Sequence, residues 1–216
     1  IHERIAPLKV IGPVMLEMAR AAQVPVCVHL DHGEDIDYLL SAMEMGFTSV
    51  MFDGSALPYD ENVAGTRAVV QAAANYHVSV EAELGRVLRP EGGGEPSEEE
   101  ADLTPEDCYT KPGEALAFVE ATGIDALAIA FGTAHGVYEA EPKLDFNRIA
   151  EIRRAVNMPL VMHGGSGVGD ADFREAIKNG VTKVNYFTYM SLAGGDAVKA
   201  FLKENAARAE VRYDEL

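Results

Sequence analysis

The chain has 216 residues, of which 48% are hydrophobic and 25% charged, a composition typical of a soluble globular protein with one sizeable core. Its formal net charge of −17 disfavours nucleic acid and anionic membranes as partners, because phosphate groups are normally bound by a basic face. The two cysteines, Cys27 and Cys108, form no CxxC or disulfide pattern. No signal peptide or membrane-length apolar run is visible, so we expect a cytoplasmic protein.

Short apolar runs alternate with amphipathic stretches along the chain, after a helix-like opening at 6–23. The apolar runs predict strands at 24–30, 48–53, 79–84, 126–132, 159–164 and 181–187. The amphipathic stretches predict helices at 34–45, 60–76, 113–122, 144–156, 170–180 and 191–206. Such alternation, with nearly continuous apolar strands, is typical of a parallel sheet covered by helices.

Both a doubly wound sheet and a (β/α)8 TIM barrel fit this α/β alternation. The polar residues favour the barrel, because they gather at the C-terminal ends of successive strands, where barrel enzymes place their chemistry. The predicted strands are fewer than the eight of a barrel. We therefore expect one domain over 1–216, a barrel whose first strands are missing from this chain. Segment 85–107 is rich in Gly, Pro and Glu, and we expect a mobile loop over the active site there.

Histidines mark the ends of three predicted strands. His32, His135 and His163 stand in the motifs HLDH, GTAHG and MHGGSG. A lone histidine at a strand end is more often a hydrogen-bonded core residue than a ligand, but in a closed barrel the three ends converge. Three neutral imidazoles and an open position are what catalytic zinc uses, and such nitrogen ligands also admit cobalt, iron or nickel.

The HLDH motif contains two further polar residues with different expected roles. Along a strand His29 and Asp31 share one face, so His29 would lie deeper in the core and orient Asp31 or a ligand. The spacing leaves two roles open for Asp31. It is either a carboxylate that orients a metal ligand or a group that transfers a proton.

A glycine-rich loop, HGGSGVGD at 163–170, joins a predicted strand to a helix. Such a loop brings backbone N–H groups and a helix N-terminus to an anion, although the same glycines also suit an ordinary tight turn. With Asn185 and Thr188, it forms the last two strand–helix connections, where many barrels bind phosphate. Beside a metal, this site predicts a small phosphorylated substrate whose carbonyl the metal polarises.

Taken together, these motifs resemble the class II, metal-dependent aldolases. The resemblance runs through HLDHGED, MFDGSALPYDEN, EAELG, ATGIDALAIAFGTAHGVY, KLDFNRIAEI, MHGGSG and TKVNYFT. The nearest branch is that of the ketose-bisphosphate aldolases, which includes fructose- and tagatose-bisphosphate enzymes. The family fold is a TIM barrel, and family members are homodimers or homotetramers.

The resemblance implies a metal-dependent aldehyde-lyase of glycolysis and carbohydrate metabolism. It would reversibly cleave a ketose 1,6-bisphosphate of fructose or tagatose type into dihydroxyacetone phosphate and an aldehyde phosphate. A zinc ion would stabilise the enediolate that forms when the C3–C4 bond breaks. The partners would be the phosphorylated sugar and copies of the chain, with no nucleic acid and no membrane.

The resemblance also implies roles for individual residues. The three histidines above would bind the zinc, and Asp31 would take the proton of the substrate C4 hydroxyl. Asp53 and Glu83 match acidic positions that can hold a second or displaced ion. A monovalent cation, Na⁺ or K⁺, would assist at the dihydroxyacetone-phosphate end. The residues that match positions holding that end are Gly136, Gly164, Ser166, Asn185 and Thr188.

Two features leave details of the reaction open. Phe187 and Tyr189 stand where fructose-bisphosphate enzymes of another branch carry acidic residues, so the sugar stereochemistry is not fixed. A loop glutamate would complete the proton relay. The candidates are Glu91, Glu95, Glu98, Glu99 and Glu100.

Two alternatives compete with the metal aldolase. A Schiff-base aldolase needs a buried lysine inside the barrel, and Lys183 shares the parity of Asn185. Lys183 lies near the start of its strand, however, which favours an ion pair. The other alternative is a non-catalytic homologue that binds sugar phosphate, and the intact set of histidines with Asp31 argues against it.

Overall fold

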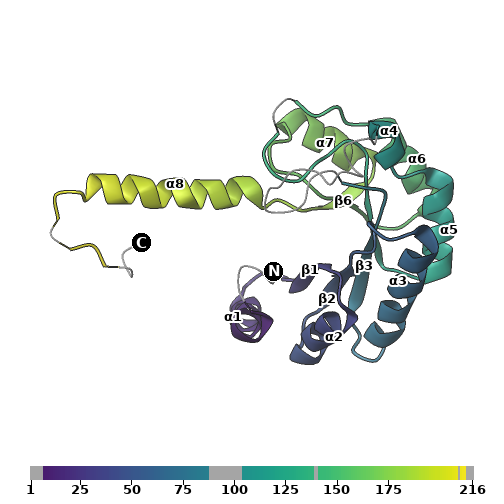
Figure 1. Cartoon of the computed structure of the whole chain (residues 1–216), viewed down its shortest axis with the longest axis horizontal. Helices are drawn as coiled ribbons and strands as arrows, with labels where there is room; N and C mark the ends of the chain where they lie inside the picture. The colour runs from purple at the N-terminus through teal and green to yellow at the C-terminus, as the bar shows by residue number, and fades with distance from the viewer. Residues whose placement is uncertain (1–6, 88–103, 139–140, 209, 213–216) are drawn as a thin grey trace.

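The computed structural model describes residues 7–87, 104–138, 141–208 and 210–212. Within these ranges one parallel sheet of six strands runs in chain order and curls around a concave face (Figure 1). Its strands are β1 (His29–Gly33), β2 (Ser49–Phe52), β3 (Ser79–Leu84), β4 (Ala126–Ile129), β5 (Leu160–Met162) and β6 (Val181–Val184).

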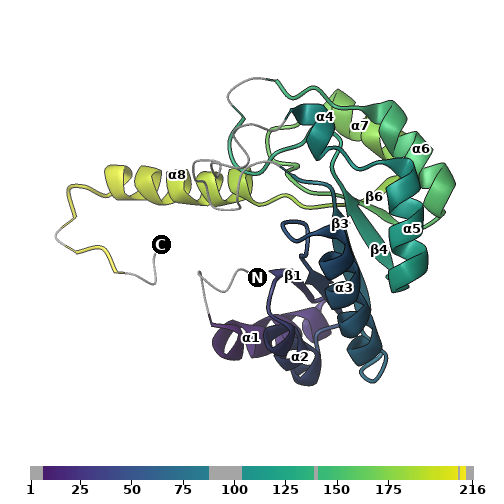
Figure 2. The same ribbon diagram turned by 45° about the vertical axis from the view of Figure 1, so that its right-hand side comes forward.

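Helices cover the outer, convex side of this sheet (Figure 2). Neighbouring helices of the covering layer contact one another along the series α2 (Ile36–Met45), α3 (Tyr59–Ala73), α5 (Pro112–Thr122), α6 (Phe146–Val156) and α7 (Asp170–Asn179). The remaining helices are α1 (Leu8–Ala21), the short α4 (Pro105–Cys108) and α8 (Thr188–Glu204). The layer arises because each helix packs the apolar face predicted from its sequence onto the sheet.

The prediction of a (β/α)8 TIM barrel, with its first strands missing from this chain, is wrong. Among the described residues the sheet has six strands, and no pairing joins β1 to β6. Closure requires every strand to have two neighbours, whereas β1 and β6 have one each. The structure is therefore an open half-barrel. Strand–helix alternation is a local property of the sequence, so it does not predict whether the first and last strands of a sheet pair with each other.

The two faces of the sheet carry different side chains. Helix-facing residues such as Leu127 and Leu160 are fully buried in one hydrophobic core. On the opposite face, the strand register runs from Glu83 on β3 through Ala128 to Lys183 on β6. Because side chains alternate along a strand, this register collects polar groups on the concave face.

The first strand starts later than its apolar run predicts. Its pairing with β2 begins at His29, because the backbone N–H of Val28 donates to the Thr48 hydroxyl instead of to a neighbouring strand. Val24 and Val26, inside the predicted strand, are 67% and 47% exposed. A helix that was not predicted, α4, begins in the polar segment 85–107 and ends just after it, at Cys108. Residues 88–103 of that segment lie outside the described ranges, so the expected mobile loop stays a prediction.

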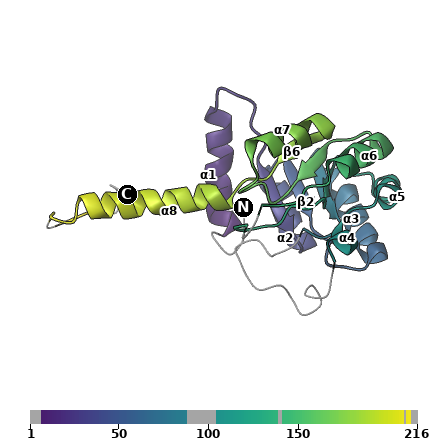
Figure 3. The ribbon, with the colours of Figure 1, turned by 90° about the horizontal axis from the view of Figure 1, so that it is seen from above.

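Helix α8 projects from the rest of the fold in all three views, as Figure 3 shows from above. None of its residues is buried. Within the ranges that the structure describes, no helix combines the length and apolar character needed to cross a membrane.

Candidate active site

A bulge at the end of β1 shapes the first part of the site. Neighbouring residues of a regular strand point to opposite faces, so Asp31 and His32 would not both reach one site. His32 has a φ of 48°, and the register between β1 and β2 shifts between Leu30 and Gly33. The irregular backbone redirects the imidazole, and both side chains then meet groups from β5 and β6.

The three histidines predicted to bind metal come together at the end of β1 and in the loops that follow β4 and β5. The ring centroid of His32 lies 4.6 Å from that of His163 and 5.2 Å from that of His135. One ring nitrogen of each residue lies within 4.8 Å of the other two. His32 Nε2 and His163 Nδ1 are 2.9 Å apart. This arrangement offers a cation three converging nitrogen ligands.

Carboxylates hold the outer nitrogens of two of these imidazoles. His32 Nδ1 contacts Asp53 Oδ2 at 2.7 Å, and His163 Nε2 contacts Glu81 Oε1 at 3.0 Å. Asp53 is itself fixed by the backbone N–H and hydroxyl of Ser55, which donate to Oδ1. A carboxylate acceptor places the imidazole hydrogen on the outer nitrogen and leaves a lone pair on the inner one. The donor set therefore fits a divalent metal such as zinc.

The same carboxylates also favour a proton on the histidine cluster. Burial lowers the pKa of His32, but the hydrogen bond to Asp53 and the charges of Asp31 and Glu83 outweigh it and raise the pKa to about 10. Burial lowers the pKa of His163 as well, and the hydrogen bond to Glu81 raises it overall. A metal ion would thus compete with protons for these nitrogens.

Asp53 and Glu83, predicted as a second metal position, both lie beside His32. The side chains of His32, Asp53 and Glu83 offer ligand atoms within 4.8 Å of one another. Glu83 Oε2 also lies 3.4 Å from His163 Nδ1. Burial and the charge of Asp53 raise the pKa of Glu83 to about 7. Burial also acts to raise the pKa of Asp53, but the His32 and Ser55 contacts lower it to about 2. The structure thus places both predicted carboxylates beside a histidine that is predicted to bind metal.

Asp31 is held as an ionised carboxylate beside the histidines. The side-chain amide of Asn185 donates to its two oxygens at 3.1 and 3.0 Å. His29 Nε2 lies 3.4 Å from Asp31 Oδ1, which is where the sequence placed this supporting residue. Burial would raise the pKa of Asp31, but His29 and the nearby charges of His32 and Lys183 contribute to holding it well below its usual range.

The predicted phosphate-binding residues come together only in part. Ser166 Oγ accepts a hydrogen bond from the backbone of Tyr189 at 3.3 Å, which brings the glycine-rich loop to the start of α8 at Thr188. Asn185 instead directs its side chain at Asp31. Gly136 follows His135 on another loop, and no contact described in the structure links it to Ser166 or Thr188.

Tyr138 is a residue of the site that was not predicted from the sequence. Its hydroxyl accepts from the backbone of Ala134 at 2.8 Å and donates to the carbonyl of Gly164 at 2.9 Å. It thereby ties the loop that carries His135 to the loop that carries His163. The motif HGVY contained this tyrosine, but nothing in the motif indicates a partner 26 residues away.

Glu81 and Lys183 form a further contact that involves the site. Lys183 Nζ lies 2.7 Å from Glu81 Oε2, so the predicted ion pair of Lys183 is confirmed. Glu81 itself was overlooked, although the alternation of EAEL places it on the same face as Glu83. The loop glutamates proposed for the proton relay lie outside the described residues. They are Glu91, Glu95, Glu98, Glu99 and Glu100.

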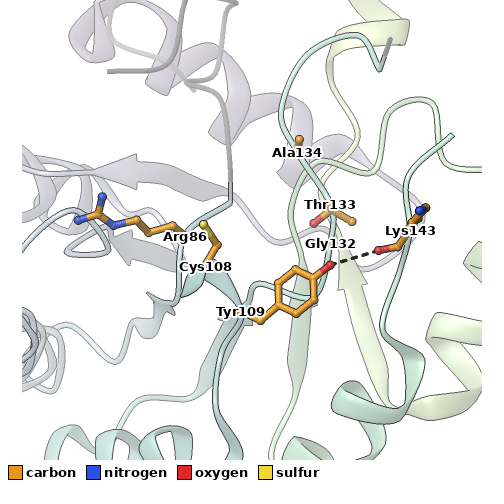
Figure 4. Close-up of a pocket in the computed structure, with 7 residues that line it drawn as sticks. All are labelled: Arg86, Cys108, Tyr109, Gly132, Thr133, Ala134 and Lys143. Carbon is orange, nitrogen blue, oxygen red and sulfur yellow. Dashed lines mark hydrogen bonds between the residues drawn. The ribbon is translucent and has the colours of Figure 1, made fainter. Parts of the chain in front are cut away.

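A cavity of about 160 Å³ adjoins the loop that carries His135 (Figure 4). On its wall, the Tyr109 hydroxyl donates to the Lys143 carbonyl at 3.3 Å. None of the three clustered histidines lines it, so this cavity is separate from the candidate metal position. Its lining residues are Arg86, Cys108, Tyr109, Gly132, Thr133, Ala134 and Lys143.

Comparisons with known proteins find several aldolases similar to this chain. A sulfofructosephosphate aldolase from Alkalicoccus urumqiensis is 42% identical over 205 residues, which cover 91% of this chain and 69% of that protein. The YdjI aldolase from Escherichia coli K12 superposes with a TM-score of 0.77 at 37% identity, over 92% of this chain and 66% of that one. Fructose-bisphosphate aldolase from Campylobacter jejuni gives a TM-score of 0.72 at 27% identity, over 94% and 63%.

The chain spans about two-thirds of the length of these relatives. Residues 2–215 match the profile of the family described as fructose-bisphosphate aldolase class-II. The chain therefore belongs to the class-II fructose-bisphosphate aldolase family.

Proposed function

We propose that this chain carries the active site of a metal-dependent aldolase that reversibly cleaves a phosphorylated ketose. The observation that supports this most directly is the convergence of His32, His135 and His163 beside the ionised carboxylate of Asp31. Zinc is the metal we expect, because its catalytic sites combine three protein ligands with an open position. The products would be dihydroxyacetone phosphate and an aldehyde.

The reaction breaks the C3–C4 bond, leaves its electron pair on C3 and removes a proton from the C4 hydroxyl. A metal held by the three histidines would supply Lewis-acid stabilisation of the negative charge beside the substrate carbonyl. Asp31 accepts the hydroxyl proton, since it is ionised and lies among the metal-binding groups. Asn185 holds both oxygens of Asp31 and so fixes the direction from which the proton is taken.

We propose the glycine-rich loop and the start of α8 as the phosphate site. Ser166 and Thr188 supply hydroxyl groups, and Gly164 offers a backbone N–H on the same loop. Ser166 is 4% exposed, so little water competes for its hydroxyl. Binding energy gained at the phosphate, away from the reacting bond, orients the ketose for cleavage.

The substrate is an anionic ketose phosphate in this proposal. The fructose and tagatose bisphosphates follow from the resemblance of the sequence to the ketose-bisphosphate branch. Sulfofructose phosphate joins them, because the relative from Alkalicoccus urumqiensis is named for it. A Schiff-base mechanism is less favoured, because the amine of Lys183 is engaged by Glu81 at 2.7 Å.

The test is a coupled assay of dihydroxyacetone phosphate release by the full-length protein, with fructose 1,6-bisphosphate, tagatose 1,6-bisphosphate and sulfofructose phosphate in parallel. We expect cleavage of at least one ketose, loss of activity after chelation, and recovery with added Zn²⁺. Activity that survives chelation, together with a lysine adduct trapped by borohydride, would overturn the metal mechanism. Absence of cleavage in the Zn²⁺-loaded protein with all three ketoses would refute the proposed substrates.

A further inference from the structure

Lys183 reaches across the concave face of the sheet from β6 to Glu81 on β3. Two strands, β4 and β5, lie between these partners in the sheet order. Lys183 Nζ lies 2.7 Å from Glu81 Oε2, while Glu81 Oε1 contacts His163 Nε2 at 3.0 Å. Each oxygen of Glu81 therefore has its own partner. Lys183, Glu81 and His163 form a chain of contacts that ends at a metal-binding imidazole.

Because Glu81 is buried, its contact with Lys183 is necessary for this chain of contacts. The side chain of Glu81 is 3% exposed and that of His163 is fully buried, whereas that of Lys183 is 35% exposed. A buried carboxylate is costly unless it is paired and hydrogen-bonded. The other basic group near Glu81 Oε2 is the His29 imidazole, at the longer distance of 3.8 Å. Lys183 is thus the group best placed to stabilise Glu81 in its present orientation.

The ammonium group of Lys183 also determines which oxygen of Glu81 accepts a hydrogen bond from His163. An ammonium only donates hydrogen bonds, so its contact with Oε2 leaves Oε1 as the acceptor for the imidazole N–H. The hydrogen on His163 Nε2 then leaves the lone pair on Nδ1, 2.9 Å from His32 Nε2. The Asn185 amide nitrogen also lies 3.2 Å from His163 Nε2, which is farther than Glu81 Oε1 at 3.0 Å, and it donates to both oxygens of Asp31 at 3.1 and 3.0 Å.

We infer that Lys183 is a positioning residue of the metal site, which acts through Glu81 to fix the orientation and tautomer of His163. This inference rests on the proposed function, because it gives His163 the role of a metal ligand. It assigns Lys183 no covalent chemistry. A Schiff-base enzyme would use such a lysine as its nucleophile, whereas here Lys183 orients a metal ligand.

The experiment measures Co²⁺ binding to the full-length protein, by competition with a chelator and by the visible spectrum of bound Co²⁺. Outer partners of metal ligands typically contribute about 10- to 100-fold to metal affinity. We expect Glu81→Gln to weaken Co²⁺ binding within that range, and Lys183→Met to weaken it by roughly tenfold. Both variants should alter the Co²⁺ spectrum, and Lys183→Arg should restore binding because it keeps the charge.

Two further variants separate positioning from general stability. Lys178→Met removes a lysine from an exposed ion pair with Glu175, at 3.3 Å on α7, and should leave Co²⁺ binding unchanged. The double variant Lys183→Met with Glu81→Gln should bind Co²⁺ no more weakly than Glu81→Gln alone, since both changes interrupt one chain of contacts. If Lys183→Met does not fold, Lys183→Gln replaces it in every comparison.

The outcomes discriminate between the inference and the proposed function. Absence of Co²⁺ binding by the unaltered protein would contradict the proposed function itself. Normal binding by that protein, together with an unchanged affinity and spectrum in Lys183→Met, would overturn the inference even if the melting temperature fell. Additive losses in the double variant would also overturn it, because Lys183 would then act independently of Glu81.

Discussion

Replacement of Gly164 by alanine tests whether the close approach of two loops sets the geometry of the metal site. Gly164 follows His163 directly, and its φ of +66° lies in the left-handed region. A Cβ at this position would lie 2.4 Å from the carbonyl oxygen of Ala134, the residue before His135. The added methyl group would therefore push apart the loops that carry two of the three histidines.

The size of the effect follows from these contacts. Real Cβ atoms essentially never approach closer than 3.0 Å, so the loops must separate by about 0.6 Å. Metal–ligand distances tolerate changes of only about 0.2 Å. Backbone in the left-handed region costs an alanine roughly 1–2 kcal/mol of folding stability in addition. We expect Gly164→Ala to weaken metal binding by tenfold or more, which corresponds to about 1.4 kcal/mol.

Gly123 provides a matched control. Its φ is +73°, and among the described residues, apart from its chain neighbours and the adjoining helix backbone, no heavy atom lies within 4 Å of its ideal Cβ position. Gly123→Ala should lower the melting temperature through the backbone conformation alone and leave the Co²⁺ dissociation constant unchanged. Chelator competition and thermal unfolding monitored by circular dichroism give both quantities for each variant. Unchanged Co²⁺ affinity in Gly164→Ala would refute the reasoning, because the loops would then accommodate the methyl group without moving the histidines.

Three further predictions concern the reaction, the protons and the metal. Asp31→Asn should lower kcat by about 10²- to 10⁴-fold, as expected for the loss of a proton-transfer group. The affinity for Co²⁺ should stay unchanged. A parallel loss of Co²⁺ binding would instead show that Asp31 has a structural role. Folding raises the pKa of His32 from 6.5 to about 10. The protonation of His32 therefore contributes its full stabilisation to the chelator-treated protein below pH 6.5, and this contribution is lost as the pH rises through about 10. A melting temperature that stays flat across this window would contradict the His32–Asp53 contact. The proton on His32 must leave before a metal binds, so the stabilisation of the protein by Zn²⁺ should grow between pH 6.5 and 9. A decrease over this range would argue against His32 as a ligand.

Local elements of this fold could be predicted because their signals lie within short stretches of sequence. The predicted strand 79–84 coincides with β3, because Val80, Ala82 and Leu84 alternate with polar residues, which is the pattern of a strand. The edge strand β1 was displaced because its start depends on a contact between Val28 and Thr48, and not on its apolar run. The barrel fold was predicted wrongly, because closure of a sheet depends on strands that must meet across the whole fold.

The chemical groups of the site were predictable, but their supports were not. His32, His135 and His163 stand in motifs at strand ends, so their residue type and position indicate metal binding. The contact between Lys183 and Glu81 joins residues 102 positions apart, and its partner could only be named from the structure. The left-handed φ of His32 is likewise invisible in the sequence, because only a small fraction of non-glycine residues adopt that conformation and the residue type does not say which.

The arrangement of the supports explains how an open sheet can hold a site with narrow geometric tolerance. Each central group is fixed by a partner from a different strand or its following loop: His32 by Asp53, His163 by Glu81, and Asp31 by Asn185. These partners lie 21 to 154 residues from the groups that they hold, so the geometry depends on the pairing of the sheet and not on the flexibility of one loop. A substitution that loosens strand pairing should therefore reduce metal affinity before it unfolds the chain.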